Sequence, residues 1–280
     1  MKDLFVYTQL DIVGMGVAGV LTVMFVMSLP LSPAPLVIGL VTFGVYVGDR
    51  ISDIKREPNA TSDRSAFMRR HKSVLSVSSA LAYGLAIAIS VFGGPLALAI
   101  TLVPGIFWIL YASDWLDSVG TSVKRLKNIL FVNSSVVAFA WATAVVFLPV
   151  SFANASITPT VIVLFAYFFF DIYINAEVPN FRDIEDDAAN GVSTLPIVFG
   201  TRRTRHILYS INIFLVAIIS IAYVHEWLPL VVVGAIIVGR LYGIILNGFL
   251  GRVENYRQLE LLGEMKHVIV GLLLLVVVLS

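Results

Sequence analysis

Two groups of carboxylates, each at the end of an apolar stretch, are the residues of this sequence with the clearest capacity for chemistry. Asp49, Asp53 and Glu57 follow one another at intervals of four residues, and Asp183 and Asp187 repeat that interval later in the chain. Residues four apart lie on the same side of an α-helix, about one turn above each other. Each group therefore predicts a ladder of carboxylates on one helix face.

A ladder of like charges needs compensation, because such pairs repel each other by about 0.2–0.5 kcal/mol in water and by more near a bilayer, where the dielectric falls. One interpretation is purely structural: neighbouring Arg50, Lys55, Arg56 and Arg182 neutralise the acids. The other is Mg²⁺, a hard cation that prefers oxygen ligands and commonly combines one or two carboxylates with phosphate oxygens. A single ladder would favour the first interpretation, whereas two ladders favour Mg²⁺ bound together with a diphosphate.

The composition indicates that the solvent of this chain is a lipid bilayer. Hydrophobic residues make up 58% of the 280 residues and charged residues only 13%, whereas soluble domains carry about 25% charged residues. The absence of cysteine excludes disulfides and thiolate metal sites. The four histidines are scattered, and none has the spacing of a metal-binding motif.

The apolar stretches predict an all-α, polytopic membrane protein made of one domain over residues 1–280. A membrane-spanning helix needs about 20 mostly apolar residues. Nine stretches meet this condition: 10–29, 33–50, 73–92, 94–113, 128–149, 158–177, 206–224, 227–248 and 263–280. The two ladders then end the second and the sixth span. This placement favours a pseudo-repeat, in which spans one to four and five to eight form two related units and the ninth span is added.

Basic residues predict the orientation of the bundle. Of the 19 Lys and Arg residues, all but Arg240 fall before the first span or in every second loop, including Lys266 between the eighth and ninth spans. The positive-inside rule places such loops in the cytosol. We therefore expect the N-terminus and the loops that follow both ladders to be cytosolic.

Motifs around the two ladders resemble those of the UbiA-type intramembrane prenyltransferase superfamily. The stretch DIEDDAANGVSTLPIVFG, from Asp183 to Gly200, is similar to the family's second motif, Asp-x-x-x-Asp followed by a Gly and a Thr-Leu-Pro stretch. The family's first motif is Asn-x-x-x-Asp-x-x-x-Asp, and this chain departs from it with Asp49 at the Asn position and Glu57 at the last Asp position. The resemblance extends over nearly the whole chain.

The resemblance implies a nine-helix intramembrane prenyltransferase that acts on a polyprenyl diphosphate. Mg²⁺ at the cytosolic mouth would be held by five acids: Asp49, Asp53, Glu57, Asp183 and Asp187. Four of them are also expected to be catalytic: Asp49, Asp53, Asp183 and Asp187. The diphosphate would be bound by a tyrosine and basic residues: Tyr111, Lys124, Lys127, Arg64 and Arg182. The allylic carbocation left behind would be attacked by a lipophilic acceptor, aromatic or lipid, in a site that excludes water.

Three polar residues within the predicted spans are further candidates for binding substrate. Asp171 lies inside the sixth span, where an ionisable group is costly; it lines the substrate cavity, is a neutral, hydrogen-bonded acid, or pairs with Arg240. Asn175 lies one turn further along and Asn133 begins the fifth span; both either line the cavity or form hydrogen bonds between helices. The stretch GMGVAG, residues 14–19, spells a dinucleotide motif, but it lies in an apolar span and follows no strand, so it indicates close helix packing.

Two other functions stay open from the sequence. A cation-coupled transporter would also bind a cation through acids, although transporters place such sites near the bilayer midplane. A family member that has lost catalysis and only binds isoprenoid lipid is compatible with the departures at Asp49 and Glu57. The pattern of the CDP-alcohol phosphatidyltransferases is absent. Membrane lipids are the expected surroundings and no nucleic-acid partner is predicted, while the acceptor and the oligomeric state are not specified.

Overall fold

The computed structural model describes residues 7–56, 63–112, 129–189, 191–253 and 255–279, and this part of the chain contains helices and loops but no strand. In chain order the helices are α2 (Leu10–Val26), α3 (Ala34–Arg56), α4 (Asp63–Arg70), α5 (Lys72–Phe92), α6 (Gly94–Ala112), α8 (Val132–Phe152), α9 (Pro159–Arg182), α10 (Ile184–Ala189), α11 (Leu195–Val224), α12 (Leu230–Asn247) and α13 (Tyr256–Leu279). The all-α prediction is confirmed.

Six of these helices are long and apolar enough to cross a membrane: α3, α5, α8, α9, α11 and α12. Helices α2 and α6 are shorter apolar helices. The chain is thus an integral, multi-pass membrane protein, as its composition predicted. Each predicted span coincides with one helix, but a crossing of the bilayer by all nine stays a prediction.

Large apolar side chains cover the outside of the bundle. Leu81 on α5, Ile213 on α11 and Ile245 on α12 are all more than half exposed. In water such a surface would aggregate, whereas in a bilayer it faces lipid tails, which are equally apolar. The outer faces of these helices therefore fit a lipid environment.

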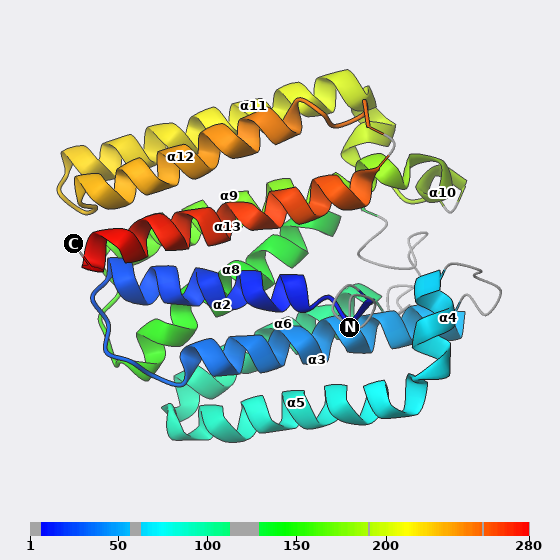
Figure 1. Ribbon diagram of the computed structural model, residues 1–280, viewed down its shortest axis with the longest axis horizontal. Coiled ribbons are helices and arrows are strands. Elements are labelled where there is room, and N and C mark those ends of the chain that lie inside the picture. Colours follow the sequence, from blue (N-terminus) through cyan, green and yellow to red (C-terminus); the bar gives the residue numbers. More distant parts are fainter. Residues whose placement is uncertain (1–6, 57–62, 113–128, 190, 254, 280) are drawn as a thin grey trace.

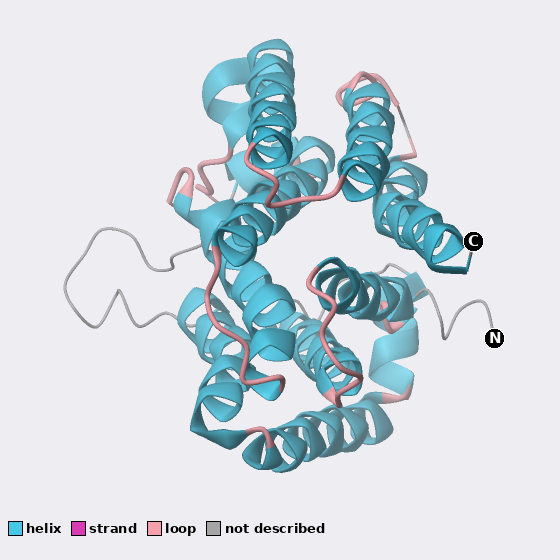
Figure 2. Ribbon diagram, turned by 90° about the vertical axis from the view of Figure 1, so that its left-hand side faces the viewer, coloured by secondary structure: helices cyan, strands magenta, loops and turns pink. Residues whose placement is uncertain are grey.

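The long helices run side by side along the long axis of the molecule, and the two short helices α4 and α10 lie at the same end of it (Figure 1). Seen end on, the helix axes point in similar directions (Figure 2). Helix α3 packs against α2 and α5, α9 packs against α8 and α11, and α13 packs against both α12 and α2. The bundle therefore brings the last helix beside the first one described.

Two glycines shape the connection between α10 and α11, which carries the end of the second acidic motif. Gly191 has a φ of +68° and follows α10, and Gly200 has a φ of +76° and breaks the regular path of α11 near its start. Residues with side chains rarely adopt these angles, so glycine is favoured at both places. Helix α11 begins before the predicted span because a short helical segment precedes Gly200.

Lys266 is a correction to the sequence analysis, which placed it in a cytosolic loop. It lies within α13, and its side chain is buried in an ion pair with Asp171 of α9. A buried carboxylate can hold a lysine inside the bundle that would otherwise be expelled to the interface. Among the described residues, the loop between α12 and α13 contains the basic residue Arg252.

Candidate active site

Asp49 and Asp53 of the first acidic motif lie in the last turns of α3. The indole nitrogen of Trp108, on α6, donates a hydrogen bond to Asp49 Oδ1 at 2.9 Å, and Arg50 Nη1 lies 3.2 Å from Asp53 Oδ2. A Cβ added to Gly48 would lie 3.3 Å from the Trp108 ring, so glycine lets this ring approach α3 closely. The Asp53 side chain is 42% exposed. Asp49 is thus held by a hydrogen bond, and Asp53, one turn later, is accessible. Together the two carboxylates can bind a ligand that comes from outside the bundle.

The second acidic motif begins where α9 ends. Pro179 lies in the last turn of α9, and its carbonyl oxygen accepts a hydrogen bond from the Asp183 backbone at 3.0 Å. The Asp187 backbone donates in turn to the Asp183 carbonyl oxygen at 2.8 Å, so that Asp183 directly precedes the short helix α10 and Asp187 lies within it. No residue of α10 is buried. The acids of the second motif therefore lie in an accessible segment that follows the C-terminal end of α9.

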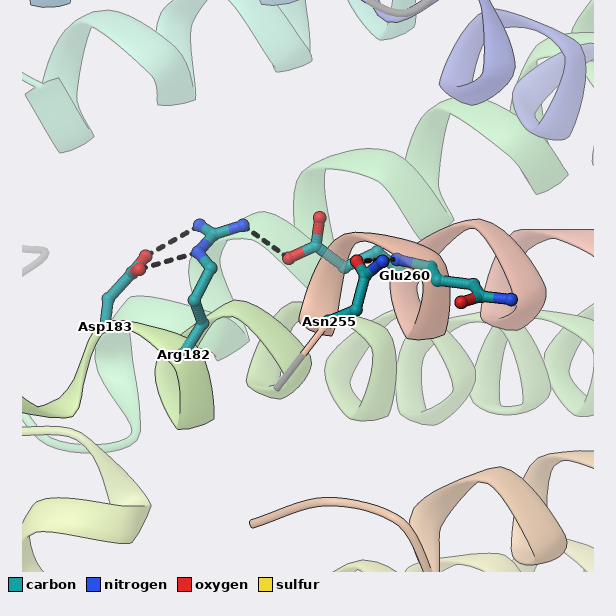
Figure 3. Close-up of polar contacts among 5 residues, drawn as sticks. Arg182, Asp183, Asn255 and Glu260 are labelled. Atoms are coloured by element: carbon teal, nitrogen blue, oxygen red, sulfur yellow. Dashed lines mark hydrogen bonds and ion pairs between the residues drawn. The ribbon is translucent and has the colours of Figure 1, made fainter. Parts of the chain in front are cut away.

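Arg182 connects the second motif to the last helix (Figure 3). Its Nε and Nη2 donate to the two carboxylate oxygens of Asp183 at 2.6 and 2.7 Å, and its Nη1 donates to Glu260 Oε1 at 2.6 Å. The start of α13 is fixed by Asn255, whose side chain accepts a hydrogen bond from the Gln258 backbone at 3.1 Å, in the manner of an N-cap. The two-pronged geometry between Arg182 and Asp183 is the strong form of this ion pair.

Glu260 was missed by the sequence analysis, although it lies between the two motifs. Its carboxylate interacts electrostatically with Arg182 and Asp183 of the second motif, and also with Arg50 and Arg64 near the first. The two motifs, far apart in the sequence, thus share one charged neighbourhood. Arg64, a predicted ligand of the diphosphate, lies on α4 within it. The only sequence signal for Glu260 was a carboxylate at the start of the last apolar stretch.

The described residues do not form a closed metal site. No group of three His, Asp or Glu side chains in this part of the chain converges closely enough to hold an ion by itself. Of the predicted site residues, Glu57, Lys124 and Lys127 lie outside the described residues, and so does the side chain of Tyr111. The structure therefore brings the motifs to one end of the bundle but leaves the ligand set of the metal as a prediction.

Asp171 lies in an ion network inside the bundle. It is fully buried and receives hydrogen bonds from Arg240 of α12 and Lys266 of α13. Arg240 also lies over the ring of Tyr167, 5.1 Å from its centre. Lys266 Nζ donates to Asn175 Oδ1 at 3.3 Å. Of the roles left open for Asp171, pairing with Arg240 is the one found, and its role in binding substrate stays a prediction.

Glu177, also missed, ties α9 to α8 two turns before the second motif. Ser134 Oγ donates to Glu177 Oε1 at 2.6 Å, and Asn180 Nδ2 donates to Glu177 Oε2 at 2.9 Å. The neighbouring Asn133 lies in the first turn of α8. Its role in lining the substrate cavity stays a prediction. A buried carboxylate with both oxygens hydrogen-bonded fixes the end of α9, and with it the position of the second motif.

An apolar cavity lies between α2, α3, α8 and α9, below the first motif. Its lining includes Gly16, Gly19, Tyr46, Trp141 and Phe168. Tyr46 lies one turn before the first motif, and its ring stacks on that of Trp141 with the ring centres 5.4 Å apart. The two glycines belong to the GMGVAG stretch. There is little spare room beside the second of them, since an added Cβ at Gly19 would lie 3.3 Å from the Phe168 ring.

Comparisons with known proteins identify the family. A sequence model of the UbiA prenyltransferase family matches residues 47–252. Digeranylgeranylglyceryl phosphate synthase from Methanoregula boonei is 30% identical over 139 residues, which span 50% of this chain and 46% of that protein, so the match covers about half of the relative's length.

Solved structures show the same fold over almost the whole chain. A digeranylgeranylglyceryl phosphate synthase superposes with a TM-score of 0.65 at 19% identity, covering 99% of this chain and 98% of that one. A UbiA homologue from Archaeoglobus fulgidus, bound to GPP and Mg²⁺, gives 0.68 at 14% identity, covering 98% and 99%. The apo UbiA homologue from Aeropyrum pernix gives 0.68 at 14% identity, covering 96% and 98%. With the family model matching most of its length, the chain belongs to the UbiA prenyltransferase family.

Proposed function

We propose that this protein transfers a prenyl group from a polyprenyl diphosphate to a lipophilic acceptor in a Mg²⁺-dependent reaction. The observation that carries the proposal is the place of the two acidic motifs. Both lie at one end of the bundle and share the charged neighbourhood of Glu260, with an apolar cavity below the first of them. This arrangement suits a substrate with a diphosphate at one end and a hydrocarbon chain at the other.

The acids of the two motifs have the chemistry that Mg²⁺ requires. They offer hard carboxylate oxygens, and the side chains of Asp53 and Asp183 are 42% and 36% exposed. Mg²⁺ keeps several water ligands and uses phosphate oxygens, so the acids need not meet in one closed cluster. Asp49, Asp53, Glu57, Asp183 and Asp187 would hold the ion, which would supply positive charge to the departing diphosphate. The structures of the Archaeoglobus fulgidus homologue with GPP or DMAPP and Mg²⁺ support this proposal.

The chain's own cations would bind and orient the diphosphate. Arg182 reaches the edge of the second motif, and Arg50 and Arg64 lie near the first. When the bond between the prenyl carbon and the diphosphate oxygen breaks, its electron pair leaves with the oxygen and negative charge grows there. Guanidinium groups already in place stabilise that charge more than they stabilise the intact substrate. Lys124, Lys127 and Tyr111 are proposed to assist in the same way.

The apolar cavity would hold the prenyl chain near its reactive end. Tyr46, Trp141 and Phe168 offer aromatic faces, which attract positive charge, and thus would favour an allylic cation over its neutral precursor. The acceptor's nucleophile would form the new bond to the cation and release a proton. Because lipid and apolar side chains exclude water, the cation would reach the acceptor before water could quench it.

Similarity to the synthase from Methanoregula boonei favours an acceptor that carries glycerol phosphate. This is tested by incubating the purified protein in detergent with Mg²⁺, ¹³C-labelled geranylgeranyl diphosphate and either a glycerol phosphate lipid or 4-hydroxybenzoate, and by mass spectrometry of the products. A labelled adduct of the glycerol phosphate lipid supports the assignment. An adduct with the aromatic acid alone would overturn the assignment of the acceptor but support prenyl transfer. Unreacted donor in all mixtures would contradict both the acceptor and the reaction.

The proposal takes residues 1–280 as one domain with both motifs facing the cytosol. The chain has no cysteine, so single cysteines report orientation without background. With an impermeant maleimide, Glu226→Cys between α11 and α12 is expected to react in intact cells, and Arg70→Cys at the end of α4 only after lysis. The opposite pattern would reverse the proposed orientation.

A further inference from the structure

A second cavity lies between α9, α11, α12 and α13, and unlike the first it is partly polar. Four polar side chains line it, one from each of these helices: Asn175, Asn212, Asn247 and Lys266. Leu259, one residue before Glu260, also lines it, so the cavity lies next to the ion pair between Arg182 and Glu260. Asn175 is seven residues before Arg182, which is about 10 Å along α9. The cavity is therefore a neighbour of the proposed active site.

Three amide groups in this cavity each have one atom without a hydrogen-bond partner in the described part of the chain. Asn212 is 1% exposed; its Nδ2 donates to the Leu208 carbonyl oxygen at 2.9 Å, which leaves its Oδ1 without a donor. Asn247 is 4% exposed, and its Nδ2 has no acceptor. Asn175 accepts from Lys266 through Oδ1, and its Nδ2 has no acceptor. Buried amides in native proteins are almost always paired, because an unpaired one is costly.

The unpaired atoms favour a ligand group that both accepts and donates hydrogen bonds. Two of them, Nδ2 of Asn175 and of Asn247, need an acceptor, and Oδ1 of Asn212 needs a donor. A hydroxyl oxygen meets both needs, since it accepts two hydrogen bonds and donates one. A carboxylate or a phosphodiester can only accept, so it would leave Asn212 unpaired. An ammonium group can only donate, and it would also be repelled by the charged Lys266.

We propose that this cavity binds the hydroxyl group of an alcohol-bearing acceptor lipid. This inference rests on the proposed function and narrows the acceptor to a lipid alcohol with a free hydroxyl. The apolar residues that share the lining with the amides suit the carbon atoms next to that hydroxyl. Water has the same hydrogen-bonding capacity, so the test separates a lipid alcohol from water.

The test is equilibrium binding to the full-length protein in detergent, with two radiolabelled probes. One is 1-O-oleylglycerol, which has free hydroxyls, and the other is its 2,3-di-O-methyl ether, which has the same chain but cannot donate a hydrogen bond. We expect the wild type to bind the free alcohol about tenfold more tightly. Asn212→Leu, close in size but without polar atoms, should abolish that difference. Ser210→Ala is the matched control, since this exposed residue of the same helix donates its hydroxyl hydrogen bond to the His206 carbonyl oxygen of its own helix.

Equal binding of the two probes by the wild type would overturn the proposal, because the cavity would then hold only water. Should Asn212→Leu fail to fold, Asn247→Leu tests the other side of the cavity in the same way. Release of diphosphate by the same preparations separates this inference from the proposed function. Selective binding of the alcohol without any diphosphate release would refute the reaction and keep the binding site, and diphosphate release without selectivity would do the reverse.

Discussion

The ion network inside the bundle gives the sharpest prediction about stability. Asp171→Asn keeps the size of the side chain but removes the carboxylate that Arg240 and Lys266 share. Two buried cationic side chains would then lose the counter-ion that both of them contact. Arginine keeps its proton under all ordinary conditions, so Arg240 cannot escape by becoming neutral.

The expected size of the loss follows from burial. The side chains of Asp171, Arg240 and Lys266 are 0%, 1% and 3% exposed, and removing one partner of such a pair typically costs about 3–5 kcal/mol. The ion pair between Arg182 and Glu260 is 38% and 25% exposed, so solvent screens it and its loss is expected to cost about 1 kcal/mol or less. Glu260→Gln is therefore the matched control.

The assay is reversible unfolding in mixed micelles with increasing sodium dodecyl sulfate, followed by tryptophan fluorescence. The free energy of unfolding should fall several times more for Asp171→Asn than for Glu260→Gln. Adding Arg240→Met to Asp171→Asn should restore part of the loss, because one of the two uncompensated charges is then gone. Equal losses for the two single variants, or a further loss in the double variant, would refute the argument from buried charge.

Three further changes address the site. Trp108→Phe removes the hydrogen bond to Asp49, so the Mg²⁺ concentration for half-maximal diphosphate release should rise about fivefold; an unchanged Mg²⁺ dependence would mean that Trp108 does not position the carboxylate. Glu260→Gln removes a negative charge and releases Arg182, so KM for the prenyl diphosphate should fall about threefold, whereas a higher KM would show that Glu260 orients Arg182 for binding. Gly19→Ala adds a single methyl group against Val145 and Phe168 and so narrows the apolar cavity, so the ratio of kcat/KM for geranyl over geranylgeranyl diphosphate should rise about tenfold; a constant ratio would place the prenyl chain elsewhere.

The length of the apolar stretches and the spacing of the acidic residues were enough to predict most of the fold. Runs of about 20 apolar residues predicted the helices, and each acidic ladder was placed at a helix end, as found for Asp53 on α3 and Asp183 after α9. Both signals are local, since they depend on residues within one helix. The pseudo-repeat and the number of crossings involve relations between helices, and they stay predictions.

Contacts between distant helices could not be predicted, because they depend on packing that no local pattern encodes. Trp108 contacts Asp49 of the first motif from another helix, and Glu260 contacts Arg182, the residue directly before the second motif; neither belongs to a motif of its own. Lys266 was assigned to a loop for the same reason: its counter-ion is 95 residues away in the sequence. The pairing of Asp171 was the contact between helices that the sequence did indicate. An acid inside an apolar span requires a partner, and Arg240 was the basic residue predicted within another span.

Diphosphate release by the purified protein with geranylgeranyl diphosphate, with and without Mg²⁺, decides whether the two acidic motifs support a metal-dependent reaction. We expect release that requires Mg²⁺ and that disappears in Asp53→Ala and in Asp187→Ala, while Glu226→Ala, which removes an acid at the opposite end of the bundle, behaves like the wild type. Release that persists in both motif variants, or that proceeds equally in the presence of a chelator, would refute the proposed site.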